Sequence, residues 1–385
     1  FDWTRLRFTL DEQYADAVLR VFVEWFDRGL IFRGKRVVNW DPVLQTSVSD
    51  IETERRTVRG KLYHIAYRLA DGSGSITIAT TRPETMLADV AVAVNPRDAR
   101  YAGFVGRSAV LPLVNREIPI IGDEYADPAF GTGAVKITPA HDANDYEVGR
   151  RHGLPMPVLI DPRGRITEDG GAYAGLDRLE ARKRIVADLQ EIGALVRVDD
   201  HDVPLVVSER SGEPIEPLLS EQWFADQPKL ATLAIEAVRS GRVRIRPQRY
   251  ERVYLDWMEN IRPWCVSRQL WWGHRLPVYY RGEETYVGIE PPEGDGWERD
   301  PDVLDTWFSS ALWPFATLGW PDDTPELRAF YPTDVLLTAR DILFLWVARM
   351  VMMGLEFPGK IPFRDVYVHS VIQAPDGRRM SKSLG

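Results

Sequence analysis

Two aspartates and a lysine in one short segment have the side chains needed to bind a small amino acid. Asp142 and Asp145 lie three residues apart, so a helix would place both carboxylates on one face. One carboxylate can bind an ammonium group, while the other can accept a hydrogen bond from a hydroxyl group. Lys136 precedes them in the same segment. A solvated helix face would show the same spacing, so the pair needs support from a wider motif.

The end of the sequence holds a basic loop with hydroxyl side chains. After a Pro-Asp-Gly turn come Arg379, Ser381, Lys382 and Ser383. The cations supply charge, and the hydroxyl groups can donate hydrogen bonds to phosphate oxygens. These residue types suit a triphosphate, and a solvated basic loop is the ordinary alternative.

Tryptophans are frequent after residue 250, and two apolar side chains in this region have helical spacing. Ile342 and Trp346 lie four residues apart, so they can line one pocket from one helix face. Ordinary core packing is the alternative interpretation of the same residues.

Hydrophobic periodicity divides the chain into α/β segments and a β-rich segment. Residues 9–29 have the spacing of an amphipathic helix with Thr9 as its cap, whereas short strands dominate residues 61–157. A helix over 341–353 lies between two strand-like apolar runs, which is the βαβ arrangement of a parallel sheet. The predicted fold class is therefore α/β: a doubly wound parallel, Rossmann-like domain interrupted by an inserted β-rich α+β domain. The predicted segments are 1–45 in the core, 46–215 inserted, 216–299 connecting, and 300–385 in the second half of the core.

Composition excludes several classes of protein. The chain has 385 residues, 44% apolar and 27% charged, which is ordinary for a globular protein of two or three domains. Its one cysteine, Cys265, excludes a disulfide framework and a cysteine-rich zinc site, in keeping with a cytoplasmic location. No run of 18 apolar residues is present, so no membrane span is expected.

The net charge of −9 means that any contact with RNA must use a local basic patch. The arginines between residues 242 and 252 are one candidate for such a patch. A solvated strand or turn is an equal alternative for that run.

Several segments resemble one family of enzymes. The loop at 379–383 resembles the Lys-Met-Ser-Lys-Ser signature of class I aminoacyl-tRNA synthetases, with arginine at its first position. Residues 264–275, 302–314 and 338–350 resemble the valyl-tRNA synthetases of that class. One departure is Ala339, where the family more often has glycine.

Two further segments resemble the editing site of the same family. They are residues 80–89, with Thr-Thr-Arg-Pro-Glu-Thr, and residues 131–146, with His-Asp-x-Asn-Asp-Tyr. In all, the resemblance extends from Asn39 to Gly385 and covers nearly the whole chain.

The resemblance implies a valine-tRNA ligase that charges tRNA(Val) with valine, using ATP with Mg²⁺ as a substrate. The loop of that family closes over ATP, and Lys382 would stabilise charge on the pyrophosphate leaving group. The residues implied to bind ATP are Arg379, Ser381, Lys382 and Ser383. Those implied to form a narrow valine slot are Trp307, Asp341, Ile342 and Trp346, with Asp341 near the substrate ammonium.

The resemblance also implies a second, hydrolytic site for mischarged Thr-tRNA(Val). Valine and threonine are nearly isosteric, and a hydrophobic pocket cannot strongly reject an isostere that only adds a hydroxyl. In this interpretation Asp142 anchors the amino group, Asp145 reads the threonine hydroxyl, and Lys136 assists catalysis. The implied site residues are Thr80, Thr81, Arg82, Phe130, Lys136, Thr138, Asp142 and Asp145. Phe130 could stack on a terminal base, and water is the expected nucleophile.

Two features of a complete synthetase are not found in the sequence. None of the six histidines belongs to a His-x-Gly-His signature, which is expected upstream of Phe1, and a helical anticodon-binding domain is expected beyond Gly385. We therefore expect a fragment competent only for editing. Ser208-Glu209-Arg210-Ser211 stands where many relatives have Cys-x-x-Cys, so no structural zinc is expected. An isoleucyl-type fragment and a non-catalytic tRNA-binding module are the alternatives.

Overall fold

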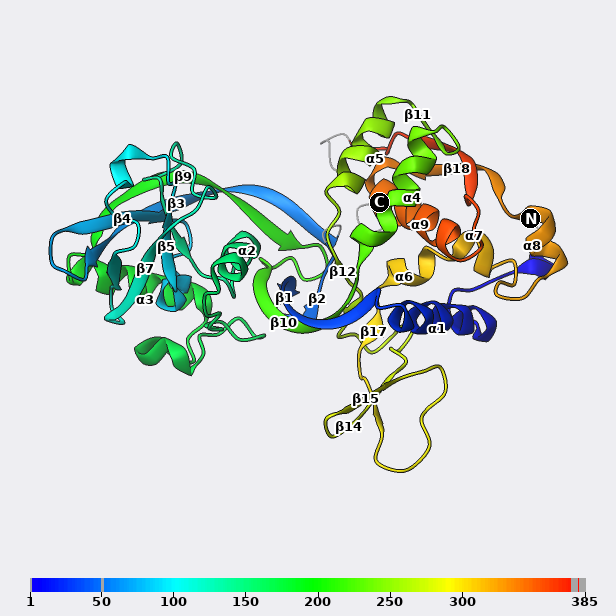
Figure 1. Ribbon diagram of the computed structural model, residues 1–385, viewed down its shortest axis with the longest axis horizontal. Helices are drawn as coiled ribbons and strands as arrows, with labels where there is room; N and C mark the ends of the chain where they lie inside the picture. Colours follow the sequence, from blue (N-terminus) through cyan, green and yellow to red (C-terminus); the bar gives the residue numbers. More distant parts are fainter. Residues whose placement is uncertain (1, 50–51, 375–379, 381–385) are drawn as a thin grey trace. The chain divides into compact units, whose positions relative to one another are not determined.

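The computed structural model describes residues 2–49, 52–374 and 380 (Figure 1). The chain divides into two compact units. The first unit joins Phe1–Gly34 to Gln222–Gly385, and the second unit is Lys35–Glu221.

Two strands carry the chain across the boundaries between the units. They are β1 (Ile31–Asp41) and β10 (Glu216–Ala225). The sequence analysis placed the inserted domain at 46–215, whereas the compact unit begins within β1 and ends within β10.

A mixed β-sheet forms the second unit. Within the described residues its strand order is β4-β3-β6-β7-β5-β8, and β9 also pairs with β3. Among the described strands of this sheet, β5 and β7 pair in parallel, and the other neighbouring strands pair antiparallel. The strands of this sheet are β3 (Thr53–Leu69), β4 (Ser75–Thr80), β5 (Ala91–Val94), β6 (Ser108–Leu111), β7 (Arg116–Gly122), β8 (Ala134–Ile137) and β9 (Leu195–Ser208). Strand β2 (Thr46–Ser47) pairs with β1 instead.

Helices cover part of this sheet. The helices are η3 (Pro83–Ala88), η4 (Ala99–Tyr101), α2 (Ala143–His152), η5 (Glu168–Tyr173) and α3 (Arg178–Glu191). Helix α3 buries Ala181, Ile185 and Leu189 at four-residue spacing, in one core with Ile65 and Tyr67 of β3. The predicted β-rich inserted domain is confirmed.

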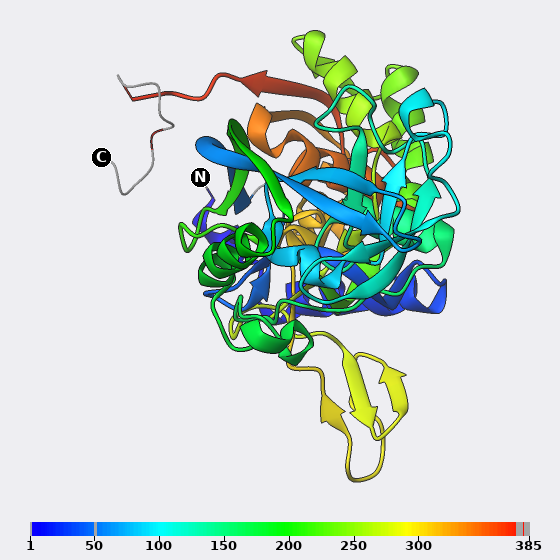
Figure 2. The same cartoon turned by 90° about the vertical axis from the view of Figure 1, so that its left-hand side faces the viewer.

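A parallel sheet with the order β11-β19-β18 lies in the first unit. Leu336 of β18 faces Val366 of β19 in parallel register, and a helical segment connects the two strands. The predicted βαβ unit, and with it the Rossmann-like part of the fold class, is therefore confirmed. The strands of this unit are β11 (Arg244–Arg246), β12 (Trp264–Cys265), β13 (Ser267–Arg268), β14 (Val278–Arg281), β15 (Glu284–Val287), β16 (Glu298–Arg299), β17 (Val303–Leu304), β18 (Thr333–Ala339) and β19 (Phe363–His369). Figures 1 and 2 show the β14–β15–β16 sheet projecting from the rest of this unit.

The helices of the first unit pack around a large aromatic and aliphatic core. They are η1 (Trp3–Arg5), α1 (Glu12–Asp27), α4 (Gln227–Arg239), α5 (Arg249–Glu259), α6 (Thr306–Ser310), α7 (Trp313–Ala316), α8 (Pro325–Phe330), η6 (Arg340–Ile342), η7 (Leu343–Val347) and α9 (Ala348–Glu356). Helix α1 buries Tyr14, Phe22 and Trp25 in that core. Its cap is Asp11, whose carboxylate accepts from the Tyr14 amide at 2.8 Å, so the predicted cap at Thr9 is wrong. Among the residues described, no helix is both long and apolar enough to cross a bilayer.

Candidate functional site

A buried lysine lies at the centre of the candidate site in the second unit. Lys136 is on β8, and its Nζ is 2.8 Å from Thr85 Oγ1, 2.5 Å from Thr138 Oγ1 and 3.2 Å from Asp89 Oδ1. An ammonium group has three N–H donors, so these three contacts use all of them. The structure thus brings Lys136 and Thr138 together, as the sequence analysis predicted, and adds Thr85 and Asp89.

Asp89 is the residue on which this cluster converges. Its Oδ1 accepts from Thr138 Oγ1 at 2.6 Å, and its Oδ2 accepts from the Tyr67 hydroxyl at 2.7 Å. Asp89 is fully buried, and burial raises the pKa of its carboxyl group, against the opposing effect of the Lys136 charge. The sequence analysis gave Asp89 no role. Asp89 lies inside the apolar run Met86–Val94, which indicates that its side chain is buried. Because a buried acid requires polar partners, this pattern could have identified Asp89 as part of a polar cluster.

Asp142 and Asp145 lie at the start of helix α2. Asp142 is the N-cap, and its Oδ1 accepts from the amides of Asn144 at 2.8 Å and Asp145 at 3.0 Å. Asp145 Oδ2 accepts from the amide of Thr138 at 2.9 Å, which joins the helix to the Lys136 cluster. The two carboxylates therefore share the first turn, one as the cap and the other just inside it.

The carboxyl group of Asp145 has an unusual pKa. Burial raises its pKa to about 7, the negative charge of Asp142 adds to the rise, and the positive charge of Lys136 opposes it. A carboxyl group with this pKa is partly protonated at neutral pH, so activity that needs the carboxylate should increase as the pH rises through 7.

Asp145→Asn should therefore stabilise the fold above neutral pH. The folded pKa of Asp145, about 7, lies above the ordinary value for an aspartate, so its proton favours the folded state and that contribution is lost as pH rises through about 7. We expect the two proteins to have similar unfolding free energies near pH 4, and the variant to be more stable by roughly 2–4 kcal/mol near pH 8. Denaturant titrations at both pH values measure this difference. Equal unfolding free energies near pH 8 would contradict the conclusion that burial raises the pKa of Asp145.

A second network of charges holds Arg82. Its guanidinium group contacts Glu84 Oε1 at 3.1 Å and Glu216 Oε1 at 2.5 Å, and donates to the His141 carbonyl at 3.1 Å. Glu84 also accepts from Arg182 at 2.7 and 2.8 Å. The Arg82 side chain nevertheless remains 28% exposed, so it can present one edge to a ligand while both buried carboxylates fix its position.

His141 connects this network to the neighbouring backbone. Its Nε2 accepts from the amides of Leu159 at 2.9 Å and Ile160 at 3.2 Å, so Nδ1 carries the proton and faces the carbonyl of Pro217 at 3.3 Å. Burial would raise the pKa of Glu216, but the charge of Arg82 and a hydrogen bond from His141 outweigh burial and hold that pKa at about 2. Glu216 is therefore ionised at neutral pH and keeps Arg82 in place.

The remaining predicted editing residues are Thr80, Thr81 and Phe130. Thr80 ends β4, and its Oγ1 accepts from the Arg82 amide at 3.0 Å, while Thr81 is partly buried beside it. Phe130 is 52% exposed in the loop before β8. Its ring packs edge to face against the ring of His201, with 6.2 Å between the ring centroids. An exposed aromatic ring can stack on a nucleobase.

In the first unit, two of the predicted slot residues lie on neighbouring helices. Trp307 is on α6, and the Trp346 indole donates to the Ser310 carbonyl of that helix at 2.9 Å. Asp341 is 3.3 Å from the guanidinium of Arg340, and Ile342 ends the 3₁₀ turn η6. Trp346 lies in the π-helix η7, so the predicted α-helical spacing between Ile342 and Trp346 is wrong.

Comparisons with known proteins decide the family. The family described as "tRNA synthetases class I (I, L, M and V)" matches residues 1–294 and 291–385. The chain belongs to the class I tRNA synthetases. It is 57% identical over 389 residues to the valine–tRNA ligase of Geobacillus stearothermophilus and 56% identical over 389 residues to that of Bacillus subtilis (strain 168). Both alignments cover 100% of this chain and 44% of the relative, so this synthetase chain spans less than half the length of those relatives.

One solved structure matches this class I synthetase chain along its whole length. It is a ternary complex of LeuRS, tRNA and LeuAMS from Agrobacterium radiobacter K84, with 19% identity, a TM-score of 0.42, and coverage of 100% of this chain and 55% of that one. The family assignment rests on the sequence matches.

Several predicted positions of this class I synthetase carry no structural description. Arg379, Ser381, Lys382 and Ser383 lie outside the described residues, so their ATP-binding roles stay predictions. In the described part of the chain, no group of three or more His, Cys, Asp or Glu side chains could hold a metal ion. At the Ser-x-x-Ser turn, Ser208 Oγ accepts from the Arg210 amide at 3.3 Å, and the expected lack of structural zinc stays a prediction.

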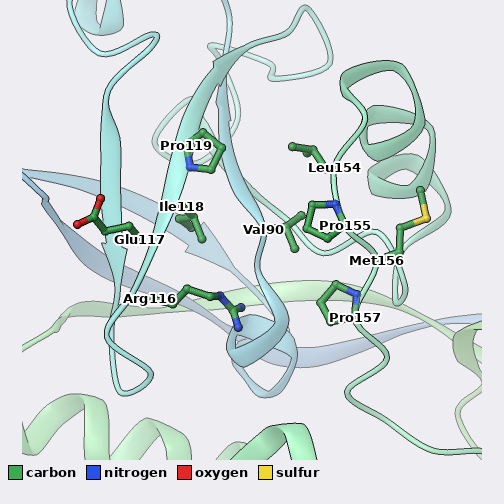
Figure 3. Close-up of a pocket in the computed structure, with 9 residues that line it drawn as sticks. All are labelled: Val90, Arg116, Glu117, Ile118, Pro119, Leu154, Pro155, Met156 and Pro157. Atoms are coloured by element: carbon green, nitrogen blue, oxygen red, sulfur yellow. The ribbon is translucent and has the colours of Figure 1, made fainter.

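The second unit contains a pocket of about 590 Å³ (Figure 3). It is lined by Val90, Arg116, Glu117, Ile118, Pro119, Leu154, Pro155, Met156 and Pro157. Arg116 donates to the carbonyls of Leu87 at 3.0 Å and Asp89 at 2.9 Å, so this side chain supports the backbone of the cluster. None of the predicted site residues of this synthetase lines the pocket.

Proposed function

We propose that the second unit hydrolyses Thr-tRNA(Val) within a valine–tRNA ligase. The observation that carries the proposal is the contact of Thr138 with both the buried Lys136 and the buried Asp145. A cation and a carboxylate held within one water-poor cluster can recognise a polar substrate and stabilise charge during hydrolysis. The names of the relatives support valine and tRNA(Val) as the substrates of the whole enzyme.

The two aspartates have different roles in this proposal. Asp145 has limited exposure and accepts a hydrogen bond from the threonine hydroxyl, which valine lacks. Asp142 is partly exposed, and while its Oδ1 caps α2, its Oδ2 binds the substrate ammonium. A carboxylate that serves both as cap and as anchor has enough lone pairs for both contacts.

Lys136 stabilises the negative charge that forms on the carbonyl oxygen when water attacks the ester. Because its three N–H donors contact Thr85, Thr138 and Asp89, a substrate oxygen must replace one of these contacts. The threonine contacts are neutral and easier to exchange than the contact with Asp89. Arg82, Thr80, Thr81 and Phe130 surround the tRNA terminus, with Phe130 stacking on its last base.

The proposal also covers activation of valine by the complete enzyme. Trp307, Ile342 and Trp346 form the apolar slot, and Asp341 receives the ammonium of valine. ATP with Mg²⁺ binds to the loop that contains Lys382. These contributions require the parts of the longer relatives that this chain does not span.

The isolated chain is expected to hydrolyse Thr-tRNA(Val) and to lack valine-dependent pyrophosphate exchange. The physical reason is that the Lys136 cluster lies wholly within the second unit, whereas activation depends on further parts of the enzyme. Deacylation of radiolabelled Thr-tRNA(Val) and exchange of labelled pyrophosphate measure the two activities.

Each rival gives a different result in the same assays. A non-catalytic tRNA-binding module would bind tRNA(Val) without accelerating deacylation. An isoleucyl-type fragment would prefer mischarged tRNA(Ile). Pyrophosphate exchange by the isolated chain would refute the restriction to editing.

A further inference from the structure

Tyr67 is a fully buried tyrosine of β3 to which the proposed function gives no role. Its ring belongs to the same core as Ile65 of its own strand and Ile76, its register partner on β4. A phenol in an apolar core costs free energy unless its hydroxyl group is hydrogen-bonded. The Tyr67 hydroxyl donates to Asp89 Oδ2 at 2.7 Å, so the core presents one polar group, and that group contacts the Lys136 cluster.

The phenol of Tyr67 is neutral at the pH of the reaction and therefore acts as a donor. Burial raises the pKa of Tyr67 well above its ordinary value, and the negative charge of Asp89 raises it further. A neutral phenol has one O–H to donate, and a carboxylate oxygen accepts it. The contact therefore has a fixed direction, from Tyr67 to Asp89.

The two oxygens of Asp89 have different partners. Oδ1 lies 3.2 Å from Lys136 Nζ and accepts from Thr138 Oγ1 at 2.6 Å, whereas Oδ2 accepts from Tyr67. Because the core fixes the tyrosine ring, the contact at Oδ2 also fixes the rotation of the carboxylate about the bond to its Cβ. The phenol thus occupies one oxygen of Asp89 and leaves the other oxygen for the lysine.

We propose that Tyr67 is a positioning residue of the hydrolytic site: by holding Asp89 Oδ2 it keeps Lys136 from pairing with both carboxylate oxygens, so that the ammonium group stays available to the substrate. This inference rests on the proposed function, in which Lys136 exchanges a threonine contact for the carbonyl oxygen of the ester. A lysine that paired with both oxygens would donate two of its three N–H groups to Asp89. It would then stabilise the transition-state oxyanion less, although the fold and the binding of tRNA would be intact.

The test is Tyr67→Phe in the 385-residue chain, with single-turnover deacylation of Thr-tRNA(Val) measured over a range of chain concentrations. Phenylalanine keeps the ring in the core and removes only the hydroxyl group. The maximal rate should fall about tenfold, as expected for the loss of one hydrogen bond to a charged group. The chain concentration that gives half of the maximal rate should change less than about twofold, because Tyr67 does not contact the substrate.

The two quantities separate a positioning role from a structural one. Partial unfolding lowers the concentration of active chain, so it raises the half-saturating concentration and leaves the maximal rate as it was. A repeat of the assay in sucrose, which favours the compact state, covers the case of a weakened fold. The loss of maximal rate should persist in sucrose, and its recovery there would show that Tyr67 only stabilises the fold.

Tyr173→Phe is the matched control in the same unit. The Tyr173 ring belongs to the same core as Tyr67, and its phenol donates to Asp188 Oδ2 at 2.5 Å, outside the Lys136 cluster. Its maximal rate should match that of the unsubstituted chain. An unchanged maximal rate in Tyr67→Phe, or an equal loss in Tyr173→Phe, would overturn the role of Tyr67. If the unsubstituted chain itself does not accelerate deacylation, the proposed function fails instead.

Discussion

Lys136→Met should reduce hydrolysis of Thr-tRNA(Val) by at least about a hundredfold, because it removes the buried cation that stabilises the transition-state oxyanion. Methionine keeps the length and apolar stem of the lysine but cannot donate to Thr85, Thr138 or the substrate. Single-turnover deacylation is the appropriate measurement, since it reports the chemical step separately from release of tRNA. A loss smaller than about fivefold would contradict the role given to Lys136.

The same substitution also leaves Asp89 charged and buried without the lysine. Breaking one half of a buried ion pair costs about 3–5 kcal/mol, so part of the lost activity could reflect a damaged fold. The double variant Lys136→Met/Asp89→Asn removes both charges. The asparagine oxygen can accept from one of the Thr138 and Tyr67 hydroxyl groups, and its amide nitrogen can donate to the other. We expect it to regain most of the unfolding free energy but none of the hydrolysis. Recovery of both would show that Lys136 is only structural.

The fold class could be predicted because its signal is local in the sequence. The apolar runs of β18 and β19 and the helical segment between them specify a parallel βαβ unit by themselves. The cap of α1 was mistaken because Thr9 and Asp11 are both good caps, and only the contact of Asp11 with the Tyr14 amide distinguishes them.

The π-helix η7 could not be predicted from periodicity. Residues 341–353 have the spacing of an ordinary helix, but the chain changes from a 3₁₀ turn to a π turn and then to α9. The contact of the Trp346 indole with Ser310, 36 residues earlier, accompanies this change. Hydrogen-bond register inside a helix depends on such distant packing, which a local pattern does not contain.

In the candidate site, too, residues in local motifs could be predicted, whereas a contact between residues far apart in the sequence could not. Residues of the two editing segments do meet, since Lys136 contacts Thr85 and Asp89. Lys136, Thr138 and Asp145 belong to the same cluster. The role of Asp89 in this cluster was not predicted, because its partners Lys136 and Thr138 are 47 and 49 residues away along the chain. A buried acid in an apolar run indicates that partners exist, but it does not identify them.

Asp145→Ala should slow deacylation of Thr-tRNA(Val) about 10- to 150-fold and change the slow deacylation of Val-tRNA(Val) far less. The lost contact is a charge-assisted hydrogen bond to the threonine hydroxyl, and valine has no hydroxyl to lose. The substitution also removes the acceptor for the Thr138 amide, which affects both substrates equally. The ratio of the two rates is therefore the quantity to measure.

Asp142→Asn is the matched comparison, because an ammonium anchor serves both substrates. Asparagine is as good a cap as aspartate, so helix α2 should keep its contacts with the amides of Asn144 and Asp145 while the negative charge is removed. Both deacylation rates should then fall together, with their ratio unchanged. Should Asp145→Ala also slow the two substrates equally, Asp145 would not read the hydroxyl, and threonine would have to be distinguished by another group in the cluster.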